Sequence, residues 1–276
     1  MAAEISGDGG MTVAKRLHYL ASNLVRNLGH SAVVLQRRGY CTGRLARTPS
    51  TASPGRALTE AFLGRELPRL LPSRDIRVLE IGCGSGSLTR LLSEFGYRGS
   101  YVGVDVVDRF DRSASSVFRC EFVCSDAHRF EPEGQFDLIV SVSALEHIPD
   151  DCGLLQRLPG FVAPGGLQLH FVPSAWGLPV FLWHGYRQYS QATLGQRFDY
   201  RRSTVYALGG VFSFLLHLIF ITLGEMLVPL RLRQRLPRLY GWLLDSSLRL
   251  DRYLPACATM LVVCQPVDDA GECPDD

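Results

Sequence analysis

The residues of this chain best suited to chemistry begin with an acid followed by three alternating glycines. Glu80 precedes Gly82, Gly84 and Gly86, at the end of an apolar run that reads as a buried strand. Glycine has no Cβ, so it adopts positive φ angles and lets a ligand lie against the backbone. A helix that starts after such a loop directs its free N–H groups and positive dipole end at the ligand. The stretch therefore predicts a nucleotide-type cradle, although its GxGxG spacing differs from both the GxGxxG dinucleotide pattern and the Gly-Lys-Ser/Thr phosphate loop.

Two further carboxylates follow apolar runs downstream of this loop. Asp105 ends the run that begins at Tyr101, and Asp126 comes shortly after the run 120–124. An ionised carboxylate only accepts hydrogen bonds and can take two hydroxyl protons at once. A carboxylate at the end of the second strand is the place where Rossmann-type folds hold ribose hydroxyls. We therefore expect Asp105 to bind a ribose.

These residues require a scaffold of alternating strands and helices. Apolar runs that read as strands lie at residues 78–81, 101–105, 120–124, 136–141, 167–172 and 258–264. Helix-type segments separate most of them, and this alternation predicts a doubly wound α/β fold with a mostly parallel sheet. Ligands of such sheets bind outside the carboxyl ends of the strands, where the acids and glycines described above are expected to lie.

Together these motifs resemble the class I S-adenosylmethionine (SAM)-dependent methyltransferases, over roughly residues 75–173. The stretch from Phe136 to Asp150 is similar to the branch with ubiquinone and menaquinone biosynthesis methyltransferases. The resemblance implies a Rossmann-like sheet of seven mostly parallel strands, with N-terminal helices and a helical insertion before the last strands. It also implies SAM as the cofactor, bound by Glu80, Gly82, Cys83, Gly84, Gly86, Asp105, Val106, Asp126, Ala127 and Ser141.

The reaction implied by the resemblance is methyl transfer to a small-molecule or lipid-linked acceptor. Methyl transfer needs alignment, and a hydroxyl acceptor also gains from a general base. His147 follows the fourth strand and is our candidate catalytic base, because histidine titrates near neutral pH; a structural role is the alternative. Glu146 is an alternative ligand for a divalent cation, as in quinone-pathway relatives, although we expect no metal. His128, His170 and His184 rank lower as bases.

The acceptor itself is left open by the motifs. An apolar insertion with arginines favours O-methylation of a lipidic, quinone-like or glycan-type substrate. A different class of function is a non-catalytic SAM-fold protein that serves as a partner in a membrane-associated assembly. The intact glycines and carboxylates argue against this alternative.

The expected organisation has six parts. They are a disordered segment (1–10), N-terminal helices or lid (11–72), the SAM-binding core (73–174), the apolar helical insertion (175–250), a terminal strand (251–266) and an acidic tail (267–276). Tyr40 and its neighbours are candidates for a lid over the cofactor. Aromatic and polar residues of the insertion either line the acceptor pocket or form the core of a helical cap: Trp176, Trp183, His184, Tyr186, Tyr189, Phe198 and Tyr200.

The segment Thr204–Gly224 has 21 residues and contains no acid, lysine or arginine. Its length suits a bilayer-spanning helix. Arginines on both sides remove any positive-inside asymmetry, and the chain must return to complete the sheet. A segment in the plane of the membrane surface, with arginines at lipid phosphates, meets both conditions. We therefore expect peripheral membrane contact through residues 204–238, with a buried helix or a homodimer interface as the alternative.

The bulk properties agree with one α/β domain and extra helices. The 276 residues carry a net charge of +2, which is no footprint for nucleic acid. The eight cysteines include no C-x-x-C pair, and residues 1–11 do not resemble a signal peptide. We therefore expect reduced cysteines and a cytoplasmic protein, peripheral at the membrane if the apolar segment binds lipid.

Overall fold

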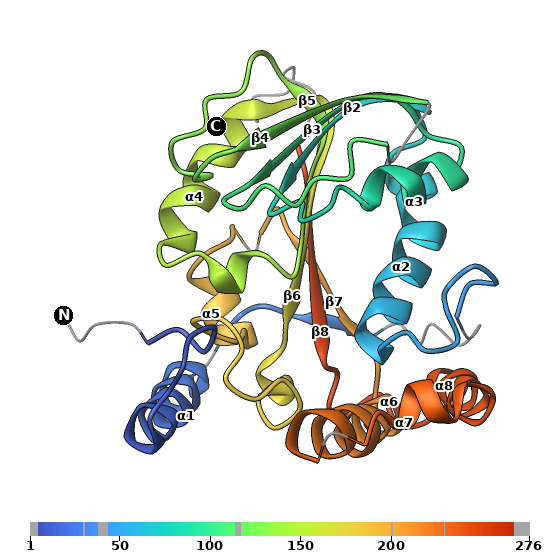
Figure 1. Ribbon diagram of the computed structural model, residues 1–276. Coiled ribbons are helices and arrows are strands. Elements are labelled where there is room, and N and C mark those ends of the chain that lie inside the picture. The colour runs from blue at the N-terminus through green and yellow to red at the C-terminus, as the bar shows by residue number, and fades with distance from the viewer. Residues whose placement is uncertain are drawn as a thin grey trace.

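The computed structural model of the protein describes residues 5–29, 31–37, 44–113, 117–199, 201–228 and 230–267. One eight-stranded sheet crosses the molecule in the order β1-β7-β8-β6-β5-β2-β3-β4 (Figure 1). The strands are β1 (Leu35–Arg37), β2 (Asp75–Ile81), β3 (Arg98–Asp105), β4 (Phe118–Cys124), β5 (Phe136–Val142), β6 (Val162–Pro173), β7 (Thr204–Leu208) and β8 (Met260–Pro266).

Helices cover both faces of the sheet (Figure 1). The α-helices are α1 (Val13–Asn27), α2 (Pro54–Leu70), α3 (Leu88–Glu94), α4 (Asp151–Arg157), α5 (Gln191–Gly195), α6 (Val211–Leu216), α7 (Leu232–Arg235) and α8 (Pro237–Leu250). Single 3₁₀ turns are η1 (Leu145–His147), η2 (Leu158–Phe161) and η3 (Ala175–Gly177), and α6 continues as the π-helix η4 (His217–Leu227).

The sheet is parallel except for β8, which runs antiparallel between β6 and β7. Its central strands are buried on both faces, as the adjacent Leu138, Ile139 and Val140 of β5 illustrate. This burial explains why the strands read as continuous apolar runs rather than as alternating patterns. Helices α2, α3 and α8 supply the core of one face, and α4 and α5 supply the other. The class I Rossmann-like fold expected from the sequence is therefore present.

Two local expectations were wrong, and both concern strands. The sheet has eight strands rather than seven, because residues 35–37, within a region expected to be helical, form β1 beside β7. Thr204–Leu208, expected to begin an apolar helix, forms β7 beside β8. A short apolar run does not distinguish a strand from a buried helix; here a neighbouring strand decides. Gly209 ends β7 with a φ of 86°, a conformation that glycine adopts without strain.

The rest of that apolar segment is helical, in α6 and η4. These helices pack beside α8, and all three lie at one end of the molecule together with α7 (Figure 1). Among the described residues, no helix combines the length and the apolar character needed to cross a membrane.

Candidate functional site

The glycine loop between β2 and α3 has the backbone that its sequence predicted. Gly82, Gly84 and Gly86 have φ angles of 70°, 56° and 77°. A Cβ on Gly82 would lie 2.4 Å from the Cβ of Ala144, and one on Gly86 would lie 2.4 Å from Cε1 of Phe122. A Cβ on Gly84 would meet no atom within 4 Å. The outer two glycines thus permit close packing, whereas Gly84 faces open space that a ligand can enter.

Asp105 ties this loop to the end of β3. Its Oδ2 accepts a hydrogen bond from the backbone N–H of Gly84 at 2.8 Å, and its Oδ1 accepts one from Val107 N–H at 3.0 Å. The side chain is nearly buried, yet carboxylate oxygens have further lone pairs for a ligand's hydroxyl groups. The neighbouring Val106 is 69% exposed and offers an apolar surface beside the carboxylate.

A cavity of about 640 Å³ opens where β2, β3, β4 and β5 end. We call it the loop cavity, and its lining includes the predicted cofactor residues Gly82, Gly84, Asp105, Val106, Asp126 and Ala127. Asp126 accepts from the N–H of His128 at 2.9 Å, which shapes the turn after β4. The structure therefore brings six of the ten predicted cofactor residues to one cavity.

The other four predicted cofactor residues lie elsewhere. Glu80 lines the neighbouring cavity, and Cys83 and Gly86 pack in and behind the loop. Ser141 is fully buried in β5, where its hydroxyl lies 2.9 Å from Nδ1 of His170. It lines neither cavity because strand residues alternate between faces, and its register directs it into the core.

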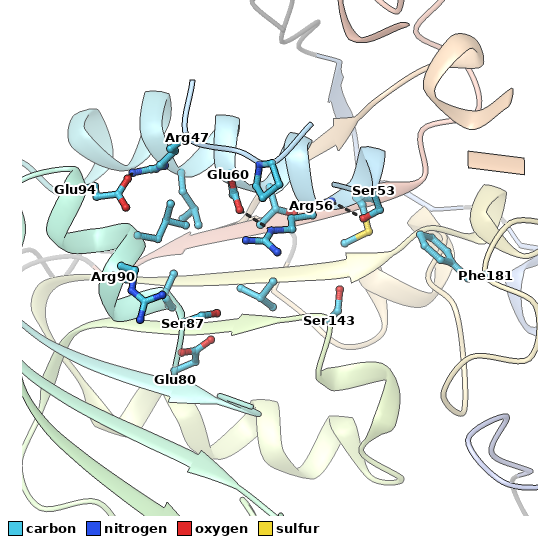
Figure 2. Close-up of a pocket in the computed structure, with 18 residues that line it drawn as sticks. Arg47, Ser53, Arg56, Glu60, Glu80, Ser87, Arg90, Glu94, Ser143 and Phe181 are labelled. Atoms are coloured by element: carbon cyan, nitrogen blue, oxygen red, sulfur yellow. Dashed lines mark hydrogen bonds and ion pairs between the residues drawn. The ribbon is translucent and has the colours of Figure 1, made fainter. Parts of the chain in front are cut away.

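The neighbouring cavity, of about 510 Å³, lies between α2, α3 and the sheet. Figure 2 shows Glu80, Ser87 and Ser143 on the sheet side. Arg56 and Glu60 project from α2 across from them, with Arg47, Arg90 and Glu94 at one end and Phe181 at the other. We call it the arginine cavity.

The charges of the arginine cavity are partly paired. Nε of Arg56 lies 2.8 Å from Oε1 of Glu60, and Arg47 forms an ion pair with Glu94. The guanidinium of Arg56 is largely exposed to the cavity side of the helix. Such a group can add a bidentate bond to an anionic oxygen.

Ser143 lines both cavities and has a φ of 50°. Positive φ is strained for a residue with a side chain, and such strain concentrates at functional sites. Its N–H donates to the carbonyl of Phe171 at 2.9 Å, which holds the turn after β5. Sequence reasoning did not name Ser143, although its place directly after the fourth strand was a usable signal.

Glu80 is a buried carboxyl group beneath the glycine loop. Burial raises its pKa to about 8, and the nearby Asp105 adds to this effect. The Tyr101 hydroxyl donates a hydrogen bond to Oε2 of Glu80 and partly opposes the shift. Glu80 is therefore mainly protonated at neutral pH and presents a donor as well as acceptors to the arginine cavity.

His147, the candidate base, lies in a cluster of titratable groups at the rim of the loop cavity. Its Nδ1 is 2.8 Å from Oδ2 of Asp8, and its Nε2 is 3.2 Å from Nε2 of His184. Nε2 of His184 is 3.6 Å from the buried Oε1 of Glu146. This carboxylate raises the pKa of His184 against the opposing effect of burial. Both ring nitrogens of His147 are thus engaged.

The same cluster fits the cation that the resemblance leaves open at Glu146. Asp8, His147 and His184 each offer a ligand atom, and these atoms all lie within 4.8 Å of one another. Neither carboxylate oxygen of Glu146 has a hydrogen-bond partner among the described residues, although both are buried. Imidazole and carboxylate donors together suit divalent transition metals. Asp8, His147 and His184 are the residues that would hold such an ion, with Glu146 beside the two histidines.

The N-terminal segment, expected to be disordered, docks beside this cluster over residues 5–10. Gly7 N–H donates to the carbonyl of Gly185 at 2.7 Å, and Gly185 N–H donates to Asp8 at 3.2 Å. Tyr19 of α1 donates to the carbonyl of His184 at 2.7 Å. Asp8 therefore lies at the rim of the loop cavity. Tyr40, the residue predicted to form a lid, lies outside the described residues.

The other residues proposed as bases or as acceptor-pocket lining lie either in the core or on the surface. His170 is fully buried, and desolvation lowers its pKa to about 3, so it is no base at neutral pH. Among the insertion aromatics, Tyr189 and Phe198 belong to the core, and Trp176 is exposed. None of the described members of that set lines the arginine cavity, where Phe181 is the aromatic residue. Tyr200 lies outside the described residues.

All six cysteines that the structure describes are free.

Comparisons with known proteins agree with this geometry. A family model described as a methyltransferase domain matches residues 56–207, more than half of the chain. The ubiquinone biosynthesis O-methyltransferase of Parvibaculum lavamentivorans is 28% identical over 43% of this chain and 49% of its own length. The trans-aconitate 2-methyltransferase of Streptomyces avermitilis is 31% identical over 40% of this chain and 43% of its own length. The chain thus spans about half the length of the curated relatives that it matches.

The fold has relatives among solved structures. The plantazolicin methyltransferase BpumL, solved with a desmethylPZN analogue and SAH, superimposes with a TM-score of 0.50 at 14% identity. The match covers 80% of this chain and 86% of BpumL, which supports the shared fold. With the glycine loop, the carboxylate at the end of β3 and the matching family model, the chain belongs to the methyltransferase domain family.

Proposed function

We propose that this protein is a SAM-dependent methyltransferase that acts on a small-molecule acceptor. The observation that carries the proposal is that two cavities meet at Ser143, beside the glycine loop. One has the features of a nucleoside site, and the other has room for a second molecule. A group-transfer enzyme needs this arrangement, because donor and acceptor must be held in line before reaction.

The loop cavity would hold the nucleoside end of the cofactor. The Asp105 carboxylate would accept hydrogen bonds from ribose hydroxyls, and Val106 would pack against the adenine ring. Asp126 and Ala127 also line the cavity, and the Asp126 carboxylate would serve as an acceptor for an adenine amino group. The cofactor would supply an electrophilic methyl group on a sulfonium, and Ser143 lies where its cavity adjoins the neighbouring one.

The arginine cavity would hold the acceptor. Its arginines favour a substrate with an anionic or strongly polar oxygen, while Phe181, Leu63 and Met260 give it apolar walls. This combination supports O-methylation of an amphiphilic acceptor: a lipidic, quinone-like or glycan-type molecule. The names of two relatives, a ubiquinone biosynthesis O-methyltransferase and a trans-aconitate 2-methyltransferase, fit acceptors that differ in size and charge.

His147 stays our candidate for the general base; it lines the loop cavity, so a hydroxyl of an acceptor in the arginine cavity would have to reach it past Ser143, which lines both. Asp8 contacts one ring nitrogen and orients the imidazole, as a third group does for the base of a catalytic assembly. The other ring nitrogen faces His184, which in turn lies beside the buried Glu146. Closure of residues 5–10 over this rim would exclude water from the reacting atoms.

The test is a calorimetric titration of the purified protein with SAM and with S-adenosylhomocysteine. We expect micromolar binding of both. Gly84→Arg should abolish it, because the side chain would enter the open space above Gly84. Asp105→Ala should weaken it at least about tenfold, or about 1.4 kcal/mol, through loss of the ribose acceptor. Asp199→Ala, at an exposed acid on another loop, is the matched control and should bind normally.

Absence of binding by well-folded protein would refute the proposal. SAM binding without methyl transfer to quinone-like, lipid or glycan acceptors would favour the alternative, a non-catalytic SAM-fold partner in a membrane-associated assembly. The intact acid-glycine loop supports the catalytic reading over this alternative.

A further inference from the structure

The helices at one end of the molecule present an apolar stripe to solvent. Leu215, Ile219, Leu223 and Met226 of α6 and η4 recur at spacings of four, four and three residues, and each is 43–52% exposed. Their shared exposure places the four side chains on the outward side of this helical segment. A helix on the surface of a globular protein normally carries polar residues there. The stripe is therefore an unpartnered apolar surface.

The opposite side of the same helix already packs against the protein. Leu216, His217 and Ile221 are buried, and the ring of His217 packs edge-on against Phe181 at 5.0 Å between centroids. The hydroxyl of Thr222 donates to the carbonyl of Val180 at 2.6 Å. The outward stripe is thus fixed in place by inward contacts.

Neighbouring segments extend the apolar surface. On α8 the exposed side includes Leu239 and Trp242, the latter 65% exposed, and Tyr253 follows the helix with its ring exposed. Trp and Tyr are enriched where proteins meet the membrane–water interface. At the same end of the molecule (Figure 1), α1 exposes Leu17 and Leu24. Exposed apolar side chains therefore occur on several helices at this end.

The charges around this surface have one sign. Arg231, Arg235, Arg238 and Arg249 are exposed, and none forms an ion pair with another described residue. The acids of residues 209–256 are all engaged elsewhere. Glu225 pairs with Arg233, Asp245 pairs with Arg44, and the buried Asp251 accepts from the N–H groups of Phe212 and Ser213.

We propose that this end of the molecule docks on the surface of an anionic lipid bilayer. The stripe on α6 and η4 would enter the boundary between headgroups and acyl chains, and the four free arginines would meet lipid phosphates. Peripheral contact of this kind needs no spanning helix. The inference does not depend on the proposed methyl transfer, because vesicle binding requires neither cofactor nor acceptor.

A second copy of the chain fits this surface less well. A two-fold dimer places the same patch of both subunits in contact. The free arginines of one copy would then face those of the other, with no exposed carboxylate in residues 209–256 to pair them. Anionic lipid supplies both negatively charged phosphates for the arginines and an apolar environment for the stripe.

Docking would also bring the acceptor cavity close to lipid. Phe181 lines the arginine cavity on one side and packs against His217 of η4 on the other. The lipid-facing helix and the cavity wall are thus in direct contact. An acceptor carried in the bilayer would reach the cavity past this contact.

The experiment is vesicle flotation of the full chain without cofactor. The probes are vesicles of phosphatidylcholine alone and vesicles that also contain phosphatidylglycerol. We expect the protein to float with the anionic vesicles, and to float less as salt is raised. Ile219→Ser combined with Leu223→Ser should lower binding about tenfold through loss of inserted area, and Arg235→Gln combined with Arg238→Gln should lower it by about as much.

The matched control is Val117→Ser combined with Arg119→Gln at the start of β4, toward the opposite end of the molecule (Figure 1). This variant also removes an exposed apolar side chain and an arginine, but far from the stripe, so it should bind vesicles like the native protein. Arg235 and Arg238 lie outside the core, so the flotation result of the Arg235→Gln, Arg238→Gln variant remains valid even if the serine variant unfolds. Failure of the native protein to float, or equal flotation of all variants, would overturn the proposal. So would a dimer in sedimentation equilibrium that the serine variant dissociates.

Discussion

Glu80 belongs to the candidate site, but its surroundings are unfavourable for an ionised carboxylate. It lies beneath the glycine loop, lines the arginine cavity and shares a hydrogen bond with Tyr101. Water is largely excluded from it, so its neutral form is favoured in the folded chain. The motif that marks the acid in the sequence carries no information about this protonation state, which depends on burial.

This environment predicts a dependence of stability on pH. The pKa of Glu80 is about 8 in the folded chain, compared with an ordinary value of 4.5. Because the folded pKa is the higher one, the stabilisation is fully present below 4.5 and declines as pH rises through about 8. Each pKa unit corresponds to about 1.4 kcal/mol, so the decline amounts to several kcal/mol. Glu80→Gln keeps a neutral group of the same shape and should flatten this part of the curve.

Urea denaturation of both proteins across that pH range would measure the effect. Glu131→Gln, at an exposed glutamate, is the control and should keep the native slope. An unchanged slope in Glu80→Gln would mean that Glu80 stays ionised in the folded chain.

Among the elements, α4 holds the insertion to the core through one buried acid. Asp151, in the first turn of α4, lies 2.9 Å from Arg187 Nη1 and 2.6 Å from Arg197 Nε. The Tyr189 hydroxyl also donates to it at 2.8 Å. Arg187 in turn donates to the carbonyls of Ile148 and Pro149, directly after the 3₁₀ turn that contains His147. The insertion thus helps to position the candidate base.

Removal of this acid should destabilise the fold strongly. Asp151→Ala leaves two buried guanidinium groups without their carboxylate, and breaking such a pair costs about 3–5 kcal/mol. The neighbouring Asp150 caps α4 by accepting from Gly153 N–H, and its loss should cost only about 1 kcal/mol. Chemical denaturation of the two alanine variants would measure the difference. Equal losses would show that the buried network contributes no more than a helix cap.

At the scale of the whole molecule, the N-terminal segment reaches the rim of the loop cavity, where Asp8 contacts His147 across 139 residues of sequence. Asp8 joins His147 and Gly185, and hydrogen bonds from His147 and Ser6 outweigh the effect of burial and lower its pKa. The segment is held by few contacts, which suits an element that opens for ligand exchange.

Asp8→Ala should therefore loosen this segment without unfolding the domain. We expect bound SAM to leave several-fold faster, with little change in melting temperature, because the residue touches the rim and not the core. Stopped-flow displacement would measure the dissociation rate, and Asp199→Ala would again serve as the control. An unchanged rate would mean that residues 5–10 do not limit exit from the loop cavity.

The sequence by itself determined the site's local parts. The glycine spacing, the acid at the end of the second strand and the alternation of strands and helices are encoded within short windows. The backbone freedom of glycine and the hydrophobic period of a strand or helix are local properties, so a short stretch of sequence reveals them. Six predicted cofactor residues consequently meet at one cavity.

Tertiary structure alone decided the features that depend on partners distant in sequence. Thr204–Leu208 became a strand because β8 lies beside it, and Ser141 lines neither cavity because its register directs it into the core. Asp8 and His184 reached His147 only through folding. The composition of 211–227 marks that segment as apolar, but packing determined which side faces solvent. A local pattern states what a segment can bury, whereas the neighbours available in the fold decide what it does bury.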